Sequence, residues 1–360
     1  MLLTCHARFA QAANIDFMSW DAAFAANNNT GAVQNAKTFR STNDYLKIAT
    51  DETDTHFRTA QTIQLAAADT PSNTIAVVYP DIGEPFRSVF SQILEGIENR
   101  AKSHVISIRV LNNTSPQDVS SEVRKQDARV VIALGRGGLK AAAALEANIP
   151  IVASAIINAP DSDPKPVMVY SLAPDPGLLF AKLKTLSPSI RRIFVVHEPE
   201  QNGWLMRMAK DAARAQGLEL VRYDATDLKA AVKNYQDIFA MADARHDAIW
   251  IPQDSISAED STVLPFVLEE SWNRSLTVFS SSVSHVRRGA LFALYPDNVE
   301  LGRKLAASAL SLTSSSPPVA KGSIQALQQV SVALNTRTAS HLGLSINVKE
   351  QGIDLIFPTP

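Results

Sequence analysis

The sequence has little of what many catalytic or membrane-bound proteins need. It contains a single cysteine, Cys5, among 360 residues, which excludes internal disulfides and cysteine-based metal sites. No segment approaches the roughly 18 consecutive apolar residues of a membrane span. The net charge of −2 leaves no basic excess for nucleic acid or an anionic membrane. With 46% hydrophobic residues, the chain is long enough to bury cores for two domains.

Catalytic signatures are absent as well. There is no Gly-x-Ser-x-Gly nucleophile elbow and no phosphate-binding loop with Gly-Lys-Ser/Thr. The turn at 135–138, GRGG, follows a predicted strand and opens a helix, but it lacks the third glycine of a dinucleotide fingerprint. The start of that helix could still receive a carboxylate. Among seven scattered histidines, only His197 follows a strand end, and a structural role is favoured for it. We therefore expect no catalytic residue, no metal site and no cofactor.

The first 72 residues differ from the rest of the chain. They are rich in Asn, Thr, Ala, Gln and Asp with weak periodicity, so residues 1–72 are predicted to be a mobile leader or tether. Leu2-Leu3-Thr4-Cys5 is similar to the end of a lipoprotein cleavage box, although no basic segment or apolar core precedes it. Two readings stay open: a lipidated Cys5 behind a gene start placed too far downstream, or, favoured, a cysteine without a role.

From Thr74 onward, short apolar strands alternate with amphipathic helices. This pattern predicts α/β architecture with parallel sheets covered by helices on both faces. Ser115 followed by Pro116 is typical of a helix start. Two successive series of about four strand–helix units predict two doubly wound lobes. The expected strands are 74–79, 105–111, 129–134, 150–155, 167–172, 192–197, 219–223, 248–251 and 277–281, with two later strands near 323–327 and 330–334.

The segment 277–303 is predicted to be the hinge between these lobes. It contains an apolar strand, a polar bend with two arginines, a second apolar run at 289–295, and a helix capped by Asp297. Because no crossover helix is evident between the two apolar runs, we expect the chain to leave one sheet for the other there. The predicted division is a leader (1–72), an N-terminal lobe (73–166 with 283–314), a C-terminal lobe (167–282 with 315–350) and a tail (351–360).

Ligands of such folds bind at the carboxyl ends of parallel strands, between the lobes. Four carboxylates follow predicted strand ends, namely Glu84, Glu198, Asp254 and Asp297. They come from separate strands, so a role in holding a ligand ammonium group is favoured over paired acid–base work. Small polar residues after other strands could orient a carboxylate, although half or more of them could simply cap helices.

Several segments resemble one family of bacterial ABC-transporter substrate-binding proteins with the type I periplasmic-binding fold, a family that includes aromatic amino-acid receptors. The segment 289–303, GALFALYPDNVELGR, is similar to a family signature. The segment 334–344, LNTRTASHLGL, is similar to the next one, and 149–152 and 248–252 match further positions. The resemblance covers about residues 74–348.

The resemblance implies a ligand shell in the cleft. Carried over by position, its residues are Gly83, Glu84, Pro85, Arg136, Gly137, Ser154 to Asn158, Gln201, Asn202, Asp254, Ser255, Ser281 and Ser282, with Asp297 matching a family aspartate. The chain departs from the pattern in three places. Arg136-Gly137 replaces a Thr-Pro or Ser-Pro pair, Ile157-Asn158 replaces Thr-Asp, and Ser282 replaces an acid. Arg136 favours a carboxylate-bearing ligand.

The expected function is therefore that of a non-catalytic solute receptor of an ABC uptake system. It would close its lobes on a small carboxylate-bearing molecule, with amino acids among the candidates, and deliver it to an ABC permease. The resemblance implies a periplasmic or membrane-anchored location outside the inner membrane, with peripheral membrane association. The alternative is a ligand-sensing domain of the same fold that signals to a partner protein. A repressor's ligand-binding half ranks below both, as does an enzyme.

Overall fold

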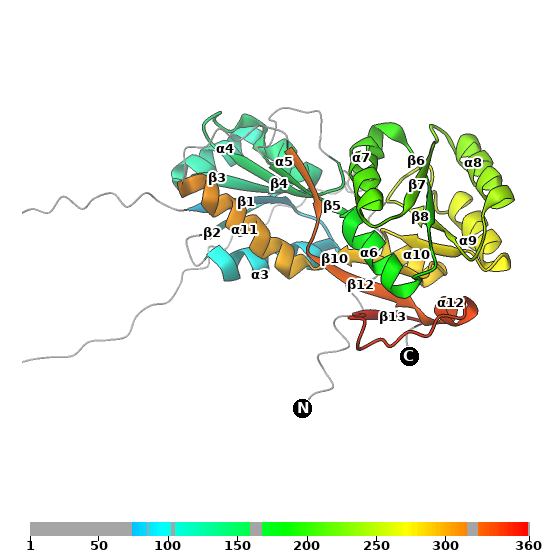
Figure 1. Ribbon diagram of the computed structural model, residues 1–360. Coiled ribbons are helices and arrows are strands. Elements are labelled where there is room, and N and C mark those ends of the chain that lie inside the picture. The colour runs from blue at the N-terminus through cyan, green and yellow to red at the C-terminus, as the bar shows by residue number, and fades with distance from the viewer. Residues whose placement is uncertain (1–73, 85, 102–104, 159–167, 315–322, 359–360) are drawn as a thin grey trace, which may run out of the picture.

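The computed structural model describes residues 74–84, 86–101, 105–158, 168–314 and 323–358. It contains a six-stranded and a seven-stranded sheet, each covered by helices, and Figure 1 shows the two resulting lobes side by side. The α/β class and the two-lobe architecture predicted from the sequence are confirmed. The leader at 1–72, with Cys5, lies outside the described residues.

The first sheet is entirely parallel and has the strand order β11-β5-β4-β3-β1-β2. Its central strands are apolar along their whole length, as expected for strands buried on both faces. One face packs on α3 and α11, and the other on α4 and α5. The elements of this lobe are β1 (Ile75–Pro80), α3 (Phe86–Ala101), β2 (Val105–Val110), α4 (Pro116–Lys125), β3 (Val130–Leu134), α5 (Gly135–Ala141), η2 (Ala142–Ala144), β4 (Ile151–Ile156), β5 (Met168–Pro174), α11 (Asn298–Ser314) and β11 (Ser323–Leu327).

The second sheet has the order β13-β12-β10-β9-β8-β6-β7, and within it only the β10–β12 pair is antiparallel among the described strands. Large aromatic side chains fill its core, with Phe180, Trp250 and Phe279 in edge-to-face contact. The elements of this lobe are α6 (Pro176–Leu186), β6 (Arg192–His197), α7 (Pro199–Ala215), β7 (Glu219–Asp224), α8 (Leu228–Met241), β8 (Asp247–Ile251), α9 (Val263–Asn273), β9 (Thr277–Ser280), α10 (Val283–Arg288), β10 (Phe292–Pro296), β12 (Val330–Asn335), α12 (Thr336–His341) and β13 (Leu355–Phe357).

The predicted start of α4 is confirmed. The Ser115 hydroxyl accepts a hydrogen bond from the Asp118 backbone N–H at 3.2 Å, and the Asp118 carboxylate accepts one from the Ser115 N–H at 2.9 Å. This reciprocal arrangement is a capping box. The two hydrogen bonds from Ser115 also hold the pKa of Asp118 below its ordinary value. The sequence predicts that the Ala-rich helix after Gly135 ends near Asn148, but α5 and the following 3-10 turn already end at Ala144.

The predicted exit from one sheet to the other between residues 281 and 289 is wrong. The strands β9 and β10 are parallel neighbours in the second sheet, with Ser280 paired to Ala293. The short helix α10 connects them and buries Val283, His285 and Val286 against the lobe. Six residues are too few to show a helical period, and the serines, histidine and arginines of this segment suggested a polar bend.

The chain crosses between the lobes at three other places. It passes from β5 to α6, from β10 to α11, and from β11 to β12. Four strands consequently differ from the predicted division of the chain: β5 and β11 belong to the first sheet, and β10 and β13 to the second. The predicted boundaries missed this because strands on either side of a crossing have the same apolar character.

The three crossings are hydrogen-bonded to one another. The Asp175 N–H donates to the Leu327 carbonyl and the Asp297 N–H to the Gln329 carbonyl, both at 2.9 Å. The Gln328 amide also reaches the Asp175 carboxylate, at 3.1 Å. Strands β5 and β10 each end in a proline immediately before their crossing. The junction is thus a compact three-segment connection.

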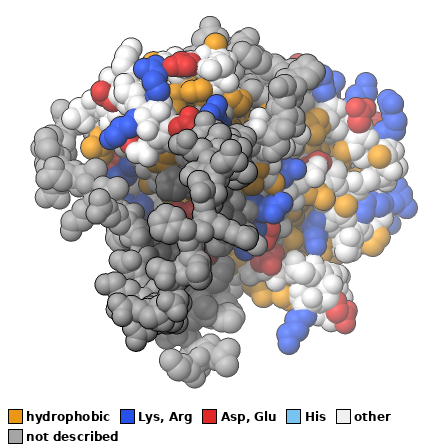
Figure 2. Space-filling view, turned by 90° about the vertical axis from the view of Figure 1, so that its left-hand side faces the viewer, with side chains coloured by type: hydrophobic (Ala, Val, Ile, Leu, Met, Phe, Trp, Pro, Cys, Tyr) orange, Lys and Arg blue, Asp and Glu red, His pale blue; other side chains and the backbone are white. Residues whose placement is uncertain are grey.

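The face of the first lobe visible in Figure 2 is chemically mixed. Where described residues are seen, basic and acidic side chains are interspersed with apolar and uncharged ones, so this view shows no field of a single sign. In the described part of the chain, no helix is both long and apolar enough to span a membrane.

Helices α3 and α11 pack closely through two glycines. A Cβ at Gly96 would collide with the backbone carbonyl of Val299, and one at Gly302 with the carbonyl of Ile93. These neighbours are backbone atoms, which cannot move aside as a flexible side chain can. The two helices can therefore approach this closely only because Gly96 and Gly302 have no Cβ atom.

We expect Gly302→Ala to lower the free energy of unfolding by about 1–3 kcal/mol, because overpacking forces the two backbones apart. Gly203→Ala in α7 is the matched control, since a methyl group at this position would have no atom within 4 Å. It should leave stability unchanged or raise it by up to about 1 kcal/mol through helix propensity. Urea denaturation measures both. Equal effects of the two substitutions would contradict the close packing of α3 on α11.

Candidate functional site

The chain crossings determine which sheet edges face each other. Strand β5 continues from its carboxyl end directly into the second lobe, and its parallel partners β1, β3 and β4 end at that same edge. Strand β10 likewise leads into the first lobe, and β6, β8 and β9 end beside it. The loops after these strands therefore border the space between the lobes (Figure 1).

On the first lobe, the structure brings Arg136 and Asn158 together. Arg136 is an exposed residue in the first turn of α5, and its Nη2 donates to the Asn158 Oδ1 at 3.2 Å. Asn158 follows β4, where Ala155 adopts a φ of 58° and the pairing register with β5 shifts. A positive φ is strained for alanine, and such outliers often occur at functional sites. The irregularity sets the direction of the segment that holds Asn158.

Ser154 plays a different part from the one predicted. It is fully buried, and its hydroxyl donates to the Tyr170 carbonyl at 2.9 Å. Ser154 therefore joins β4 to β5 beneath the surface. Glu84 and Gly83, in contrast, are exposed in the loop after β1, and Gly137 is half-buried beside Arg136.

On the second lobe, Asp254 is the centre of a buried network. Its carboxylate accepts hydrogen bonds from the Glu198 N–H at 2.7 Å, the Asn202 amide at 2.8 Å, and the N–H groups of Ile256 and Ser257 at 2.9 and 2.7 Å. Such charge-assisted bonds are strong, and here they use both carboxylate oxygens. Asp254 is 0% exposed. In this structure it fixes the ends of β6 and β8 and presents no oxygen to a ligand ammonium group, contrary to the predicted role.

Glu198 extends this network to α7. Its carboxylate accepts from the N–H groups of Glu200 and Gln201 at 3.0 and 2.6 Å and so caps the helix. Tyr235 lies beneath, where its hydroxyl donates to the Ser257 carbonyl at 3.0 Å. Burial, reinforced by the negative charge of Asp254, raises the pKa of the Tyr235 phenol.

Gln201, which is half-buried, and Ser255 form the rim above the network. The Gln201 amide donates to the Ser255 hydroxyl at 2.9 Å, and Ser255 is exposed. Asn202 is buried below them and donates to the Asp254 carboxylate and the Gln253 carbonyl. Of these four predicted residues, Gln201 and Ser255 therefore lie at the rim, whereas Asn202 and Asp254 are buried and support it.

The predicted serines after β9 are also buried supports. The Ser281 hydroxyl accepts from the Trp250 indole at 3.1 Å. Ser280 lies 2.7 Å from the Nδ1 of His285 and accepts from the Ser282 N–H at 3.0 Å. Trp250 and His285 were not predicted as part of the site, because an apolar strand and a short helix gave no signal of a polar contact.

Asp297 and His197 have other partners than the rim residues. The Asp297 carboxylate accepts from the Glu300 N–H at 3.0 Å and caps α11 at the crossing, as its sequence context predicted. His197 is buried at the end of β6, with its Nε2 3.2 Å from the Asp224 carboxylate. Within the described ranges, no group of three or more His, Cys, Asp or Glu residues is arranged to hold a metal ion.

A family model described as "ABC transporter substrate binding protein" matches residues 96–351, which is more than half of the chain. The chain belongs to this family. Proteins of the family bind small molecules for an ABC transporter and are extracytoplasmic. The resemblance read from the sequence is therefore confirmed. A search of curated proteins gave no match.

One solved structure of a substrate-binding protein shares the fold, and two further matches have lower TM-scores. The ligand-free, open structure of CD0873 from Clostridium difficile, a substrate-binding protein with adhesive properties, is 17% identical with a TM-score of 0.56, covering 80% of this chain and 100% of that one. An ABC domain from Streptococcus pneumoniae in complex with L-Trp is 15% identical with a TM-score of 0.47, covering 79% and 100%. A periplasmic ribose ABC transporter protein from Conexibacter woesei is 12% identical with a TM-score of 0.44, covering 79% and 98%.

The supporting role of Asp254 in this family member can be measured. We expect Asp254→Asn to lower the free energy of unfolding by about 2–3 kcal/mol, because the amide group cannot accept all of the hydrogen bonds that the carboxylate accepts. The exposed Asp211→Asn on α7 serves as the control and should change stability by no more than about 0.5 kcal/mol. Urea denaturation compares them. If the two variants were equally stable, Asp254 would not organise this edge.

Proposed function

We propose that this family member binds a small carboxylate-bearing organic molecule between its two lobes. The observation that carries the proposal is the position of Arg136, an exposed guanidinium at the carboxyl edge of the first sheet, oriented by Asn158. A guanidinium can bind a carboxylate through two parallel hydrogen bonds. Amino acids are among the candidate ligands, because the family resemblance includes receptors for aromatic amino acids.

The second lobe supplies the other half of the proposed site. Gln201 and Ser255 lie at the rim on the opposing edge and offer amide and hydroxyl groups. Glu84 is exposed after β1 and offers a carboxylate for an ammonium group. The buried residues Ser154, Asn202, Asp254, Ser281 and Ser282 hold these loops in place rather than contacting ligand. Asp297 acts at the hinge.

Binding in this proposal is coupled to lobe closure. A ligand that contacts both edges only when they approach each other shifts the population toward the closed state. The three crossing segments are the natural hinge, because a few residues there can absorb the rotation of two rigid lobes. The closed form would then be recognised by an ABC permease outside the inner membrane, with the protein either periplasmic or membrane-anchored.

The ligand class is tested by a thermal-shift screen of the full chain against aromatic and other amino acids, small carboxylates and neutral analogues such as amides. At a hundredfold excess over Kd, a ligand stabilises the native state by about 2.7 kcal/mol, a shift of several degrees. We expect carboxylates to stabilise the protein and their amides to have little effect. Stabilisation by neutral compounds alone would contradict the carboxylate proposal.

Arg136→Gln then tests the role of the guanidinium. With the carboxylate that binds, affinity should fall about tenfold or more, because a charge-assisted hydrogen bond contributes about 1.5–3 kcal/mol. Arg100→Gln, an exposed substitution on α3 of the same lobe, should leave affinity unchanged. Isothermal titration measures Kd, and thermal melting checks that both variants fold. Undiminished affinity in Arg136→Gln would remove Arg136 from the site.

One alternative function uses the same site differently. A sensing domain of the same fold would close on its ligand in the same way and report its ligand state to a partner protein. Co-purification with the products of adjacent genes distinguishes an uptake function from a sensing function. Ligand-dependent binding to a permease supports uptake, whereas binding to a kinase or cyclase would support sensing instead.

A further inference from the structure

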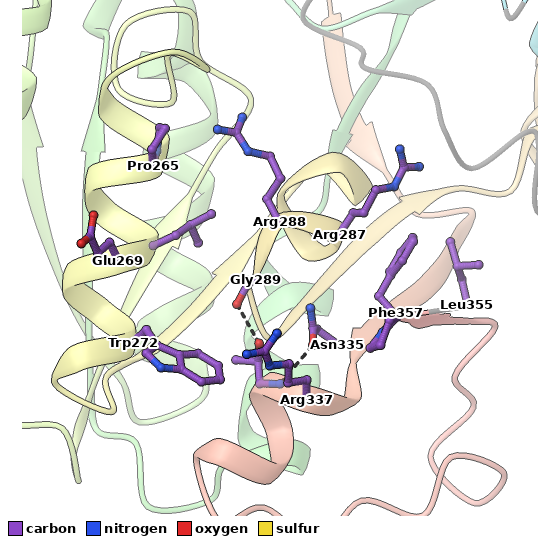
Figure 3. A pocket seen from close by; sticks show the side chains of 13 residues that line it. Pro265, Glu269, Trp272, Arg287, Arg288, Gly289, Asn335, Arg337, Leu355 and Phe357 are labelled. Carbon is purple, nitrogen blue, oxygen red and sulfur yellow. Dashed lines mark hydrogen bonds between the residues drawn. The ribbon is translucent and has the colours of Figure 1, made fainter. Parts of the chain in front are cut away.

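A cavity of about 960 Å³ opens in the second lobe, away from the edge that carries Gln201 and Ser255 (Figure 3). Its walls come from α9, the end of α10, the start of α12, and β13. A volume of this size is typical of sites for small organic ligands. The residues that matter for its chemistry are Trp272, Arg287, Arg288, Arg337 and Phe357.

The cavity lies at the opposite edge of the second sheet from the inter-lobe site. Gly289 lines it and lies before β10, whose carboxyl end leads to the first lobe. Asn335 also lines it and ends β12, which runs antiparallel to β10 and pairs Leu334 with Phe292, the first residue of β10. The wall is thus built at the amino ends of the parallel strands. A ligand here would occupy a site separate from the one between the lobes.

Two of the guanidiniums are positioned by aromatic rings. The Arg287 Cζ lies 5.5 Å from the centre of the Phe357 ring, and the Arg337 Cζ lies 5.4 Å from that of Trp272. Cation–π contacts of this kind restrict the side chains without neutralising their charge. Within the described part of the chain, neither Arg287 nor Arg337 makes an ion pair with a carboxylate.

The remaining charges leave the cavity positive. Arg288 is already paired, since its guanidinium donates to the Asp260 carboxylate at 2.7 Å and to the Asp260 carbonyl at 2.8 Å. Glu269 is the single acidic residue among those that line the cavity, against three arginines. In Figure 3, Glu269 lies on the α9 side, whereas Arg287 and Arg337 come from the α10 and α12 sides.

Two aromatic rings contribute apolar surface to the walls of the cavity. Trp272 is half-buried and stacks on His341, with ring centres 3.8 Å apart and planes 9° from parallel. The His341 Nε2 lies 2.9 Å from the Trp272 backbone carbonyl, which holds the imidazole ring against the indole. Phe357 is buried at the opposite wall. Rigid aromatic groups offer contact area at little cost in conformational entropy.

We propose that this cavity is a second binding site, for a small aromatic oxyanion such as an aromatic carboxylate or phosphate. The positive charges of Arg287 and Arg337 attract the charged group into the cavity, and the parts of Trp272 and Phe357 that line the cavity contact the flat apolar body. Both requirements act together: a neutral aromatic compound lacks the charge interaction, and a ring-free anion lacks the apolar contact. The site binds independently of ligand in the inter-lobe cleft.

The test uses the full chain with benzoate and phenyl phosphate as probes, and benzyl alcohol and acetate as the neutral and ring-free comparisons. Saturation-transfer NMR and titration calorimetry measure binding. We expect saturable binding of both aromatic anions and at least about tenfold weaker binding of the two comparison compounds, as the loss of a charge-assisted contact implies.

Variants locate the site. Arg287→Gln and Arg337→Gln should each weaken binding about tenfold, and the double substitution should abolish it. Arg214→Gln, an exposed substitution on α7, is the matched control and should have no effect. Arg136→Gln, at the other site, should also have no effect, which separates failure of this proposal from failure of the proposed function. Circular dichroism and thermal melting confirm that each variant folds.

Three results would overturn the proposal: equal affinity in the Arg287 and Arg337 variants, equal affinity for benzyl alcohol, or loss of binding in Arg136→Gln alone. Binding of an acidic aromatic peptide without any binding of benzoate or phenyl phosphate would likewise contradict it, in favour of a protein-docking surface. Saturable binding of either aromatic anion that is lost in the double variant supports it.

Discussion

The backbone hydrogen bonds at the lobe junction are the constraint on which the rest of the structure depends. They tie Asp175 to Leu327 and Asp297 to Gln329, and so hold three crossing segments together. Because β5 and β10 reach this junction by their carboxyl ends, every strand parallel to them ends on the same side. The loops that follow those strands consequently oppose each other across the junction. The place of the proposed ligand site follows from chain connectivity before any side chain is considered.

The two edges use charge in contrasting ways. On the second lobe, the Asp254 and Glu198 carboxylates accept hydrogen bonds from backbone N–H groups and from an amide side chain. These hydrogen bonds hold the ends of the loops in place. On the first lobe, Arg136 is exposed and donates a hydrogen bond to the Asn158 side chain. Buried charges that are fully hydrogen-bonded stabilise geometry, whereas an exposed, oriented charge is available for recognition. In the proposed function, one set of predicted residues therefore supports the loops and another set contacts the ligand.

The sequence predicted the parts of the fold that local patterns determine. Alternating apolar strands and helices, the capping box at Ser115 and Asp118, and the cap at Asp297 all rest on residues close together in the chain. The helix α10 was not predicted because its six residues are too few to show the helical period of apolar residues. The allocation of β5, β10 and β11 to their sheets depends on long-range pairing, which strand composition does not encode.

The candidate site was predictable by position but not by role. Most predicted residues follow a strand end or lie at the hinge, as the general rule for such sheets requires, whereas Ser154 lies within β4. Whether a carboxylate is exposed or buried, however, depends on distant donors. Asp254 receives its hydrogen bonds partly from Glu198 and Asn202, which are 56 and 52 residues away. The sequence around Asp254 contains no pattern that indicates these hydrogen-bond partners.

Ligand-driven closure about the three-segment junction is the central claim, and an inter-lobe distance tests it most directly. Cys5 is the only cysteine, so Cys5→Ser leaves a background in which Lys140→Cys on α5 and Lys210→Cys on α7 carry a pair of spin labels. We expect the carboxylate found by screening to shorten the distance between the labels and to narrow its distribution. An unchanged distance at saturating ligand would contradict closure as the basis of binding.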